Sequence, residues 1–187
     1  MRNTLSNSIF SFSLLILSLL IITPEAGAKS NSDTLSLMAE IMPKKLWNKI
    51  KKQRVFVTFG FASCPDICPM VLSDISALIT KLKEKGVKQN FAVLFITVDP
   101  ERDTQKVLND YVENFQSNFF GVSTNQKDLK NLSKAFGVSF RLNKKPGTTQ
   151  EFYTVDHTAL VYLINPAEKK ITELTPPLKL KNVEKSL

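Results

Sequence analysis

The chain has 187 residues, of which 43% are hydrophobic, and a formal net charge of +8. This much apolar sequence excludes an intrinsically disordered chain, and the length predicts one domain with a single core. Two cysteines are too few for a disulfide-rich scaffold. We therefore expect the cysteine pair to carry chemistry rather than to hold the fold together.

Residues 1–28 are expected to be a signal peptide or an N-terminal membrane anchor. Arg2 precedes an apolar run over 9–22, Pro24 follows that run, and Ala-Gly-Ala at 26–28 has the small residues of a cleavage site. The run is short for a membrane span, which favours cleavage over anchoring. In either case we expect the rest of the chain to be exported, either free in the periplasm or anchored facing it.

Residues 29–53 predict a basic helical lead-in with a break at Pro43, because the residue before a proline is pushed out of the helical region. The densest positive charge is the run KKLWNKIKKQR at 44–54. Charge runs are usually solvated helix faces. The alternative is a surface that attracts an anionic membrane or an acidic protein partner. Nucleic acid is not an expected partner, since the exported chain carries no recognition motif.

Residues 54–187 predict an α/β domain. Nearly continuous apolar runs over 54–61 and 91–98 are typical of buried central strands, and 119–123 predicts a shorter one. Helical segments with an apolar stripe alternate with these strands. The expected helix limits are Gly86 as the stop of the first, Asp103 as the N-cap of the second, and Asn125 and Gly137 as the start and end of the third.

Three further strand-like runs follow, over 151–156, 158–165 and 169–174. They are too close together for crossover connections, so we expect that edge of the sheet to be antiparallel. The whole order predicts a central mixed sheet flanked by helices, with right-handed crossovers between its parallel strands.

Candidate site residues follow the ends of the predicted strands. Cys64 and Cys68 come directly after the first strand, Asp99 comes after the second, and His157 lies just before the run 158–165. In open α/β sheets, sites lie at the carboxyl ends of the strands. We therefore expect these residues to meet at one end of the sheet.

Cys64 and Cys68 are separated by three residues, and each is followed by a proline. Pro65 and Pro69 suit the first turn of a helix. If the stretch is helical, both sulfurs lie on one face, and a disulfide between them is feasible but strained. The dipole at a helix N-terminus is also expected to favour their thiolates.

Two thiolates with one imidazole suit a copper ion, as Cu(I) or Cu(II). The chain has one histidine, His157. A closed structural zinc site, which usually has four protein ligands, is therefore poorly supported. Met70, directly after Pro69, offers a soft thioether near such a site, but packing along the apolar stripe of the helix is the better interpretation of this residue.

Three motifs together carry a resemblance to a known family. CPDICP at 64–69, DPERDT at 99–104 and VDHTALVYLINP at 155–166 resemble, in order and spacing, the motifs of the Sco/SenC family of copper-binding, thioredoxin-like proteins. The resemblance spans roughly residues 54–175. It implies a thioredoxin-like fold and a part in assembling the binuclear copper centre of cytochrome c oxidase. The implied partner is the copper-bearing oxidase subunit or another copper protein.

The resemblance also implies roles for single residues. Copper is expected to be held by Cys64, Cys68 and His157. The second motif is expected to form a loop near the site, in which Asp99 hydrogen-bonds to the site or tunes it.

Other residues of these motifs are open to two interpretations. Arg102 and Asp103 form either an ion pair that orders the loop or an ordinary capped helix start. Asp156 either orients His157 from outside the ligand set or faces solvent at the end of a strand.

The main alternative function is a thiol–disulfide reductase, which would keep the cysteines of a metal-receiving partner ready through a mixed disulfide. Against it as the sole function, thioredoxin-type catalysts have two residues between their cysteines, whereas this pair has three. A peroxidase on the same scaffold is disfavoured, because Phe61 stands where a peroxiredoxin-like site needs Thr or Ser.

Overall fold

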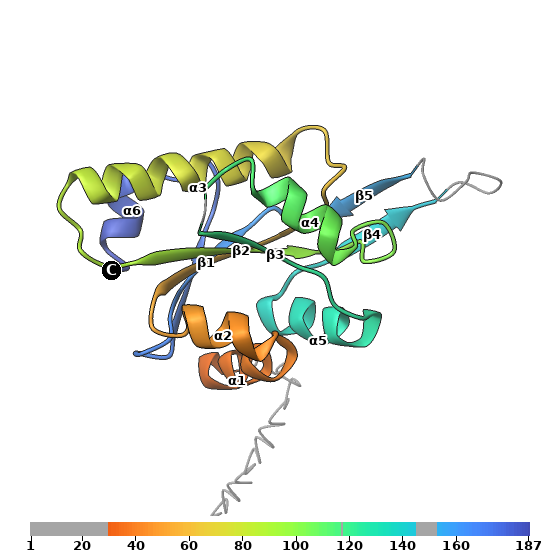
Figure 1. Cartoon of the computed structure of the whole chain (residues 1–187), viewed down its shortest axis with the longest axis horizontal. Coiled ribbons are helices and arrows are strands. Elements are labelled where there is room, and N and C mark those ends of the chain that lie inside the picture. The colour runs from red at the N-terminus through yellow and green to blue at the C-terminus, as the bar shows by residue number, and fades with distance from the viewer. Residues whose placement is uncertain (1–29, 117, 145–152) are drawn as a thin grey trace, which may run out of the picture.

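The structure is a computed structural model that describes residues 30–116, 118–144 and 153–187 (Figure 1). The signal or anchor expected over 1–28 lies outside the described residues, as does the start of the strand expected over 151–156. Within the described ranges, no helix is both long enough and apolar enough to cross a membrane.

The centre of the molecule is a five-stranded mixed sheet in the order β3-β2-β1-β6-β7. The first three strands run parallel, and the last two are antiparallel to their neighbours. This confirms the expected mixed sheet and its antiparallel edge. β1 and β2 are buried almost throughout, as their continuous apolar sequences predict. The strands are β1 (Arg54–Gly60), β2 (Phe91–Thr97), β3 (Phe119–Val122), β6 (Val161–Asn165) and β7 (Lys170–Leu174).

Helices cover both faces of this sheet (Figure 1). The two crossover helices, which connect β1 to β2 and β2 to β3, lie on one face, as right-handed crossovers in a single direction require. Three helices cover the opposite face, and a short last helix lies beside the end of the first crossover helix. In chain order they are α1 (Asn31–Ile41), α2 (Lys44–Ile50), α3 (Ile67–Glu84), α4 (Gln105–Val112), α5 (Gln126–Phe136) and α6 (Leu180–Glu184).

Side-chain caps set the starts of three of these helices, α1, α4 and α5. The Asn125 side chain accepts a hydrogen bond from the backbone of Asp128, which confirms its expected role as the N-cap of α5. Gly137 ends that helix in the left-handed conformation. Asp103 was expected to cap α4, and this is wrong. Thr104 is the N-cap, and the Asp103 carboxylate is buried instead.

The described part of the lead-in, from residue 30, is helical on both sides of Pro43. Its apolar residues Met38, Met42 and Ile50 are almost completely buried in the same core as the sheet. α1 packs against α5 and β7. The segment is therefore a structural part of the domain rather than an appendage to it.

A two-stranded arm projects beside the main sheet (Figure 1). It consists of β4 (Phe140–Asn143) and β5 (Thr154–His157), paired antiparallel, and we call it the β4–β5 arm. β4 was not expected, because its four residues are only half-buried and carry no apolar run. The strand expected over 151–156 was assigned to the edge of the main sheet. That assignment is wrong, since β5 pairs with β4.

The burial of α1 can be tested by a cavity substitution. Met38→Ala removes a fully buried side chain, so we expect the free energy of unfolding to fall by about 2–5 kcal/mol. Urea denaturation measures this change. Glu40→Ala, at an exposed position of the same helix, is the control and should change stability by less than about 0.5 kcal/mol. Equal, small effects of both substitutions would mean that α1 is not part of the core.

Candidate metal centre

The two cysteines lie at the start of α3, but not on one continuous helix. Cys64 is in the loop after β1, where its backbone N–H donates to the Phe61 carbonyl at 3.1 Å. Cys68 is in the first turn of α3, and Pro69 follows it there, whereas Pro65 lies before the helix. Both cysteines carry free thiols and are buried. Only Cys68 lies on the helix, so the two cysteines do not form an i, i+4 pair on one helix face.

His157 brings an imidazole to Cys68. Its Nε2 lies 3.5 Å from the Cys68 sulfur, and its Nδ1 lies 3.2 Å from the backbone carbonyl of Thr158. A carbonyl oxygen can only accept a hydrogen bond, so the proton of the neutral ring belongs on Nδ1. The lone pair of Nε2 then faces the sulfur, where it accepts from the Cys68 S–H.

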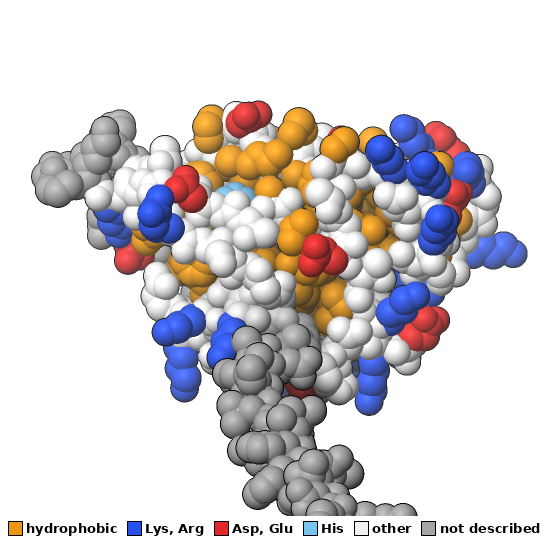
Figure 2. Space-filling model, turned by 180° about the vertical axis from the view of Figure 1, so that it is seen from behind, with side chains coloured by type: hydrophobic (Ala, Val, Ile, Leu, Met, Phe, Trp, Pro, Cys, Tyr) orange, Lys and Arg blue, Asp and Glu red, His pale blue; other side chains and the backbone are white. Residues whose placement is uncertain are grey.

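These two side chains border a small, partly open space between α3 and the sheet. Its volume is about 10 Å³, the least that one water molecule needs. Figure 2 shows the imidazole reaching the surface among hydrophobic side chains. The other lining residues are Thr58, Phe59, Ile67, Val71, Phe95 and Ala159.

Burial keeps both groups neutral near pH 7. Burial raises the pKa of the Cys68 thiol well above its usual range, and the neighbouring Cys64 raises it further, although a hydrogen bond from the Phe61 backbone opposes the shift. The expectation that the helix dipole favours the thiolate is therefore wrong for Cys68, because desolvation is the larger effect. Burial also lowers the pKa of His157.

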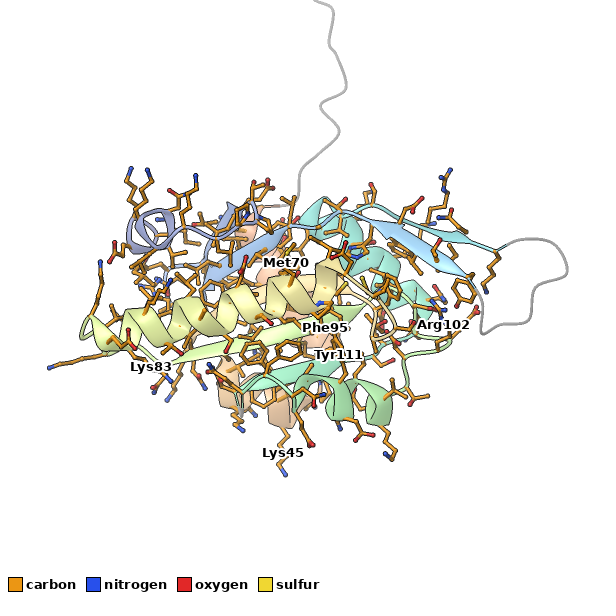
Figure 3. All side chains as sticks on the ribbon, turned by 90° about the horizontal axis from the view of Figure 1, so that it is seen from above. Lys45, Met70, Lys83, Phe95, Arg102 and Tyr111 are labelled. Atoms are coloured by element: carbon orange, nitrogen blue, oxygen red, sulfur yellow. The ribbon has the colours of Figure 1, made fainter. Side chains whose placement is uncertain are left out.

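Gly60, which the sequence analysis did not single out, gives Cys68 its place. A Cβ on this residue would lie 2.6 Å from Phe95 Cε2 and 2.7 Å from the Cys68 sulfur. The Phe95 ring is itself backed by Tyr111, with ring centroids 5.3 Å apart (Figure 3). In the sequence, a glycine at the end of a strand-like run is the feature that can indicate such a close approach.

Asp99 acts on the site through the β4–β5 arm. Its buried carboxylate accepts a hydrogen bond from the Tyr153 hydroxyl at 2.6 Å and pairs with Arg102. The Arg102 guanidinium lies 3.7 Å from the centre of the Tyr153 ring and donates to the Tyr153 carbonyl. The loop after β2 is thus fastened to the segment that leads into β5 and His157. The expected ion pair of Arg102 with Asp103 is wrong, because Asp99 takes that place.

Asp103 instead fastens the loop that carries Cys64. Its Oδ2 accepts hydrogen bonds from the Thr97 hydroxyl at 2.6 Å and from the Ala62 backbone N–H at 3.0 Å. Burial raises the pKa of Asp103, and these two hydrogen bonds oppose the shift. The residue that was expected to cap a helix therefore holds the cysteine loop against the end of β2.

Asp156 and Met70 point away from the centre. Asp156 is exposed and pairs with Arg141 at 3.3 Å, since neighbouring residues of a strand face opposite sides. The alternative role for Asp156, orienting His157, finds no contact here, because His157 Nδ1 lies 3.2 Å from the Thr158 carbonyl instead. Met70 is 50% exposed, so its expected packing in the helix stripe is wrong (Figure 3).

Within the described ranges, no three His, Cys, Asp or Glu side chains meet closely enough as they stand to enclose a metal ion. The structure brings Cys68 and His157 into contact and leaves Cys64 close by in its loop. The arrangement is therefore a thiol–imidazole pair with a second thiol beside it.

The fold and this site define a thioredoxin-like domain with a cysteine pair and a histidine at the carboxyl end of its sheet. Residues 46–186 match the family model SCO1/SenC, and the chain belongs to the SCO1/SenC family. The SCO2-like protein of Rickettsia prowazekii is 35% identical over 118 residues, which are 63% of this chain and 56% of that protein. The mitochondrial SCO1 homolog 1 of Arabidopsis thaliana is 31% identical over 76% of this chain and 42% of its own length.

Solved structures agree with the fold. The crystal structure of Arabidopsis thaliana ScoI with copper bound has a TM-score of 0.65 and 27% identity, covering 74% of this chain and 84% of that one. Yeast Sco1 with copper bound has a TM-score of 0.62 and 33% identity, covering 76% of each chain. The chain spans 37–61% of the lengths of the curated relatives it matches.

The link between Asp99 and Tyr153 can be tested by removing one hydroxyl. Tyr153→Phe keeps the ring under Arg102 but deletes a buried hydrogen bond to a carboxylate, so the free energy of unfolding should fall by about 1.5–3 kcal/mol. Hydrogen exchange of the β5 amides should accelerate as well.

Tyr111→Phe is the matched control, since the buried Tyr111 hydroxyl has no hydrogen-bond partner in the described part of the chain. Its unfolding free energy should stay near that of the wild type. If the two substitutions had the same effect, the Asp99–Tyr153 bond would not be what holds the arm.

Proposed function

We propose that the protein is a copper metallochaperone, which binds one copper ion through Cys64, Cys68 and His157 and assists assembly of the binuclear copper centre of cytochrome c oxidase. The observation that carries the proposal is the 3.5 Å contact between the Cys68 sulfur and His157 Nε2, which joins positions 89 residues apart. Copper-bound structures of relatives from Arabidopsis and yeast support it.

The donor atoms suit a soft ion. Thiolate sulfur selects Cu(I), and imidazole suits copper in either oxidation state. Two such ligands on one ion lie roughly 3.5–4 Å apart, judged from the bond lengths that thiolate and imidazole have on zinc. The observed separation of Cys68 and His157 falls in this range. Cys64 is in a loop rather than in α3, so its side chain can turn to the ion without moving the helix.

Loading exchanges protons for copper. The Cys68 thiol stays protonated at neutral pH because its pKa is raised, and its proton leaves as the sulfur takes up the ion. His157 needs no deprotonation, since burial lowers its pKa, and its Nε2 lone pair already faces the sulfur. The Thr158 carbonyl holds the ring in this tautomer.

Delivery requires that a partner reach the ion. The imidazole reaches the surface within an apolar patch (Figure 2). An apolar rim of this kind suits contact with another protein. The partner we propose is the copper-bearing oxidase subunit or another copper protein, met outside the cytoplasm by a domain that is exported or anchored through residues 1–28.

The alternative of a thiol–disulfide reductase is less well supported. Attack on a disulfide needs a thiolate, and burial raises the pKa of the Cys68 thiol. The same burial is no obstacle to a metal ion, which displaces the proton. The raised pKa of Cys68 therefore favours copper binding over disulfide exchange at this sulfur.

Removal of the imidazole tests the ligand set. His157→Ala should weaken copper binding at least about 100-fold, because loss of a ligand exceeds the 10–100-fold loss that follows from disturbing a residue behind one. A competition titration with a copper chelator under reducing conditions measures this affinity. Asp156→Ala, on the opposite face of β5, is the control and should bind copper as the wild type does. Wild-type affinity in His157→Ala would refute the proposed ligand set.

Copper affinity should also depend on pH. Each thiol proton displaced on binding makes the affinity rise about tenfold per pH unit below the pKa of that thiol. Because burial raises the pKa of Cys68 and lowers that of His157, the rise should continue from pH 6 to pH 8 without a break near pH 6.5. Chelator competition at several pH values checks this. A pH-independent affinity would contradict release of the Cys68 proton.

A further inference from the structure

The end of the sheet opposite the cysteines gathers positive charge. β1 runs toward the site, so its first residue, Arg54, lies at the far end, together with the end of α3, the β6–β7 turn and α6. In Figure 3, Lys83 lies near one end of the molecule and Arg102 near the other. We call the far group the basic end. Its members are Lys51, Lys52, Arg54, Lys83, Lys85, Lys88, Lys169, Lys170, Lys181 and Lys185.

Contacts bring these distant segments together. Arg54 lies 3.7 Å from Glu168 of the β6–β7 turn, and Lys85 pairs with Glu184 of α6 at 2.7 Å. A surface hollow is bordered by Lys52, by the loop that precedes β2 and by the β6–β7 turn. The basic end is therefore one surface that tertiary packing assembles from four segments, rather than the single run at 44–54. Within that run, Lys49 lies over the Phe120 ring instead.

Carboxylates do not balance this charge. Glu84, Glu168 and Glu184 are the acidic residues among the same segments, and the cations outnumber them. The other end of the molecule differs, because Arg102, Arg141 and Lys144 each pair with a carboxylate there. The molecule therefore has an electrostatic polarity along its sheet, with positive charge away from the thiols. Such a polarity orients a protein near a charged surface.

We propose that the basic end docks on an anionic lipid surface and that the thiol–imidazole site then faces away from it. All but one of its cations are lysines, which are flexible, hydrated point charges rather than the planar forks that recognise single phosphates or carboxylates. They are spread over separate turns and helix ends. A diffuse array of this kind suits the headgroups of a membrane better than one acidic peptide or a nucleic acid, which uses aromatic stacking as well.

In this orientation, the length of α3 gives the distance between the site and the lipid surface. α3 has 18 residues and runs from Cys68 to the basic end, a length of about 27 Å. Docked in this way, the domain presents its apolar rim and His157 to a partner that stands out from the membrane. This orientation does not depend on which ion the site binds.

Vesicle partitioning of the full chain tests the proposal. We would compare vesicles of phosphatidylcholine with vesicles of phosphatidylcholine mixed with phosphatidylglycerol, and take the ratio of the two partition coefficients. Any contribution of residues 1–28 is common to all variants. Each lysine near an anionic surface adds about fivefold to binding, so the triple variant Lys52→Gln, Lys83→Gln, Lys170→Gln should lower the ratio about 100-fold.

The matched control removes equal charge from α5, through Lys127→Gln, Lys130→Gln and Lys134→Gln, which are exposed positions on another face. Its ratio should stay within about threefold of the wild type, since those lysines lie outside the docked end. Thermal unfolding checks that both variants fold, and copper titration should be unchanged in both. Equal losses in both variants, or no preference of the wild type for anionic vesicles, would overturn the proposal. The latter result would leave an acidic protein as the partner of this surface.

Discussion

The site depends on a buried carboxylate that stands behind it. Asp99 accepts a hydrogen bond from the Tyr153 hydroxyl and pairs with Arg102, which lies in turn over the Tyr153 ring. These contacts fasten the chain entering β5 to the loop after β2. His157 is the last residue of β5 and lies opposite Phe140 of β4, so this fastening and the β4–β5 pairing together place it beside Cys68. Asp103 does the same for the loop that carries Cys64.

Burial then decides the chemistry of the assembled group. The low-dielectric surroundings keep a proton on the Cys68 sulfur and keep the His157 ring neutral. A group in this state is suited to exchange a thiol proton for a soft cation, and it is poorly suited to attack a disulfide. The charge distribution also distinguishes the two ends of the molecule, because positive charge gathers at the end of α3 that is remote from the cysteines.

Sequence patterns predicted what local rules control. The continuous apolar strands, the break at Pro43 and the cap at Asn125 all follow from nearest-neighbour sterics and burial. The errors came where a side chain had two competing partners. Asp103 is of a residue type that often caps helices, but its carboxylate accepts hydrogen bonds from the Thr97 hydroxyl and the Ala62 amide instead. β4 had no pattern of its own, since it is defined only by its pairing with β5.

The sequence by itself determined the α/β order, the antiparallel edge and the three motifs that resemble one family, because each rests on residue type and spacing. Only the tertiary structure decided that Cys68 and His157 touch, that Cys64 lies outside the helix and that Asp99 works through Tyr153. It also decided that the lysines of four segments form one basic end. These outcomes depend on contacts between residues far apart in the chain, where desolvation and packing outweigh any local preference.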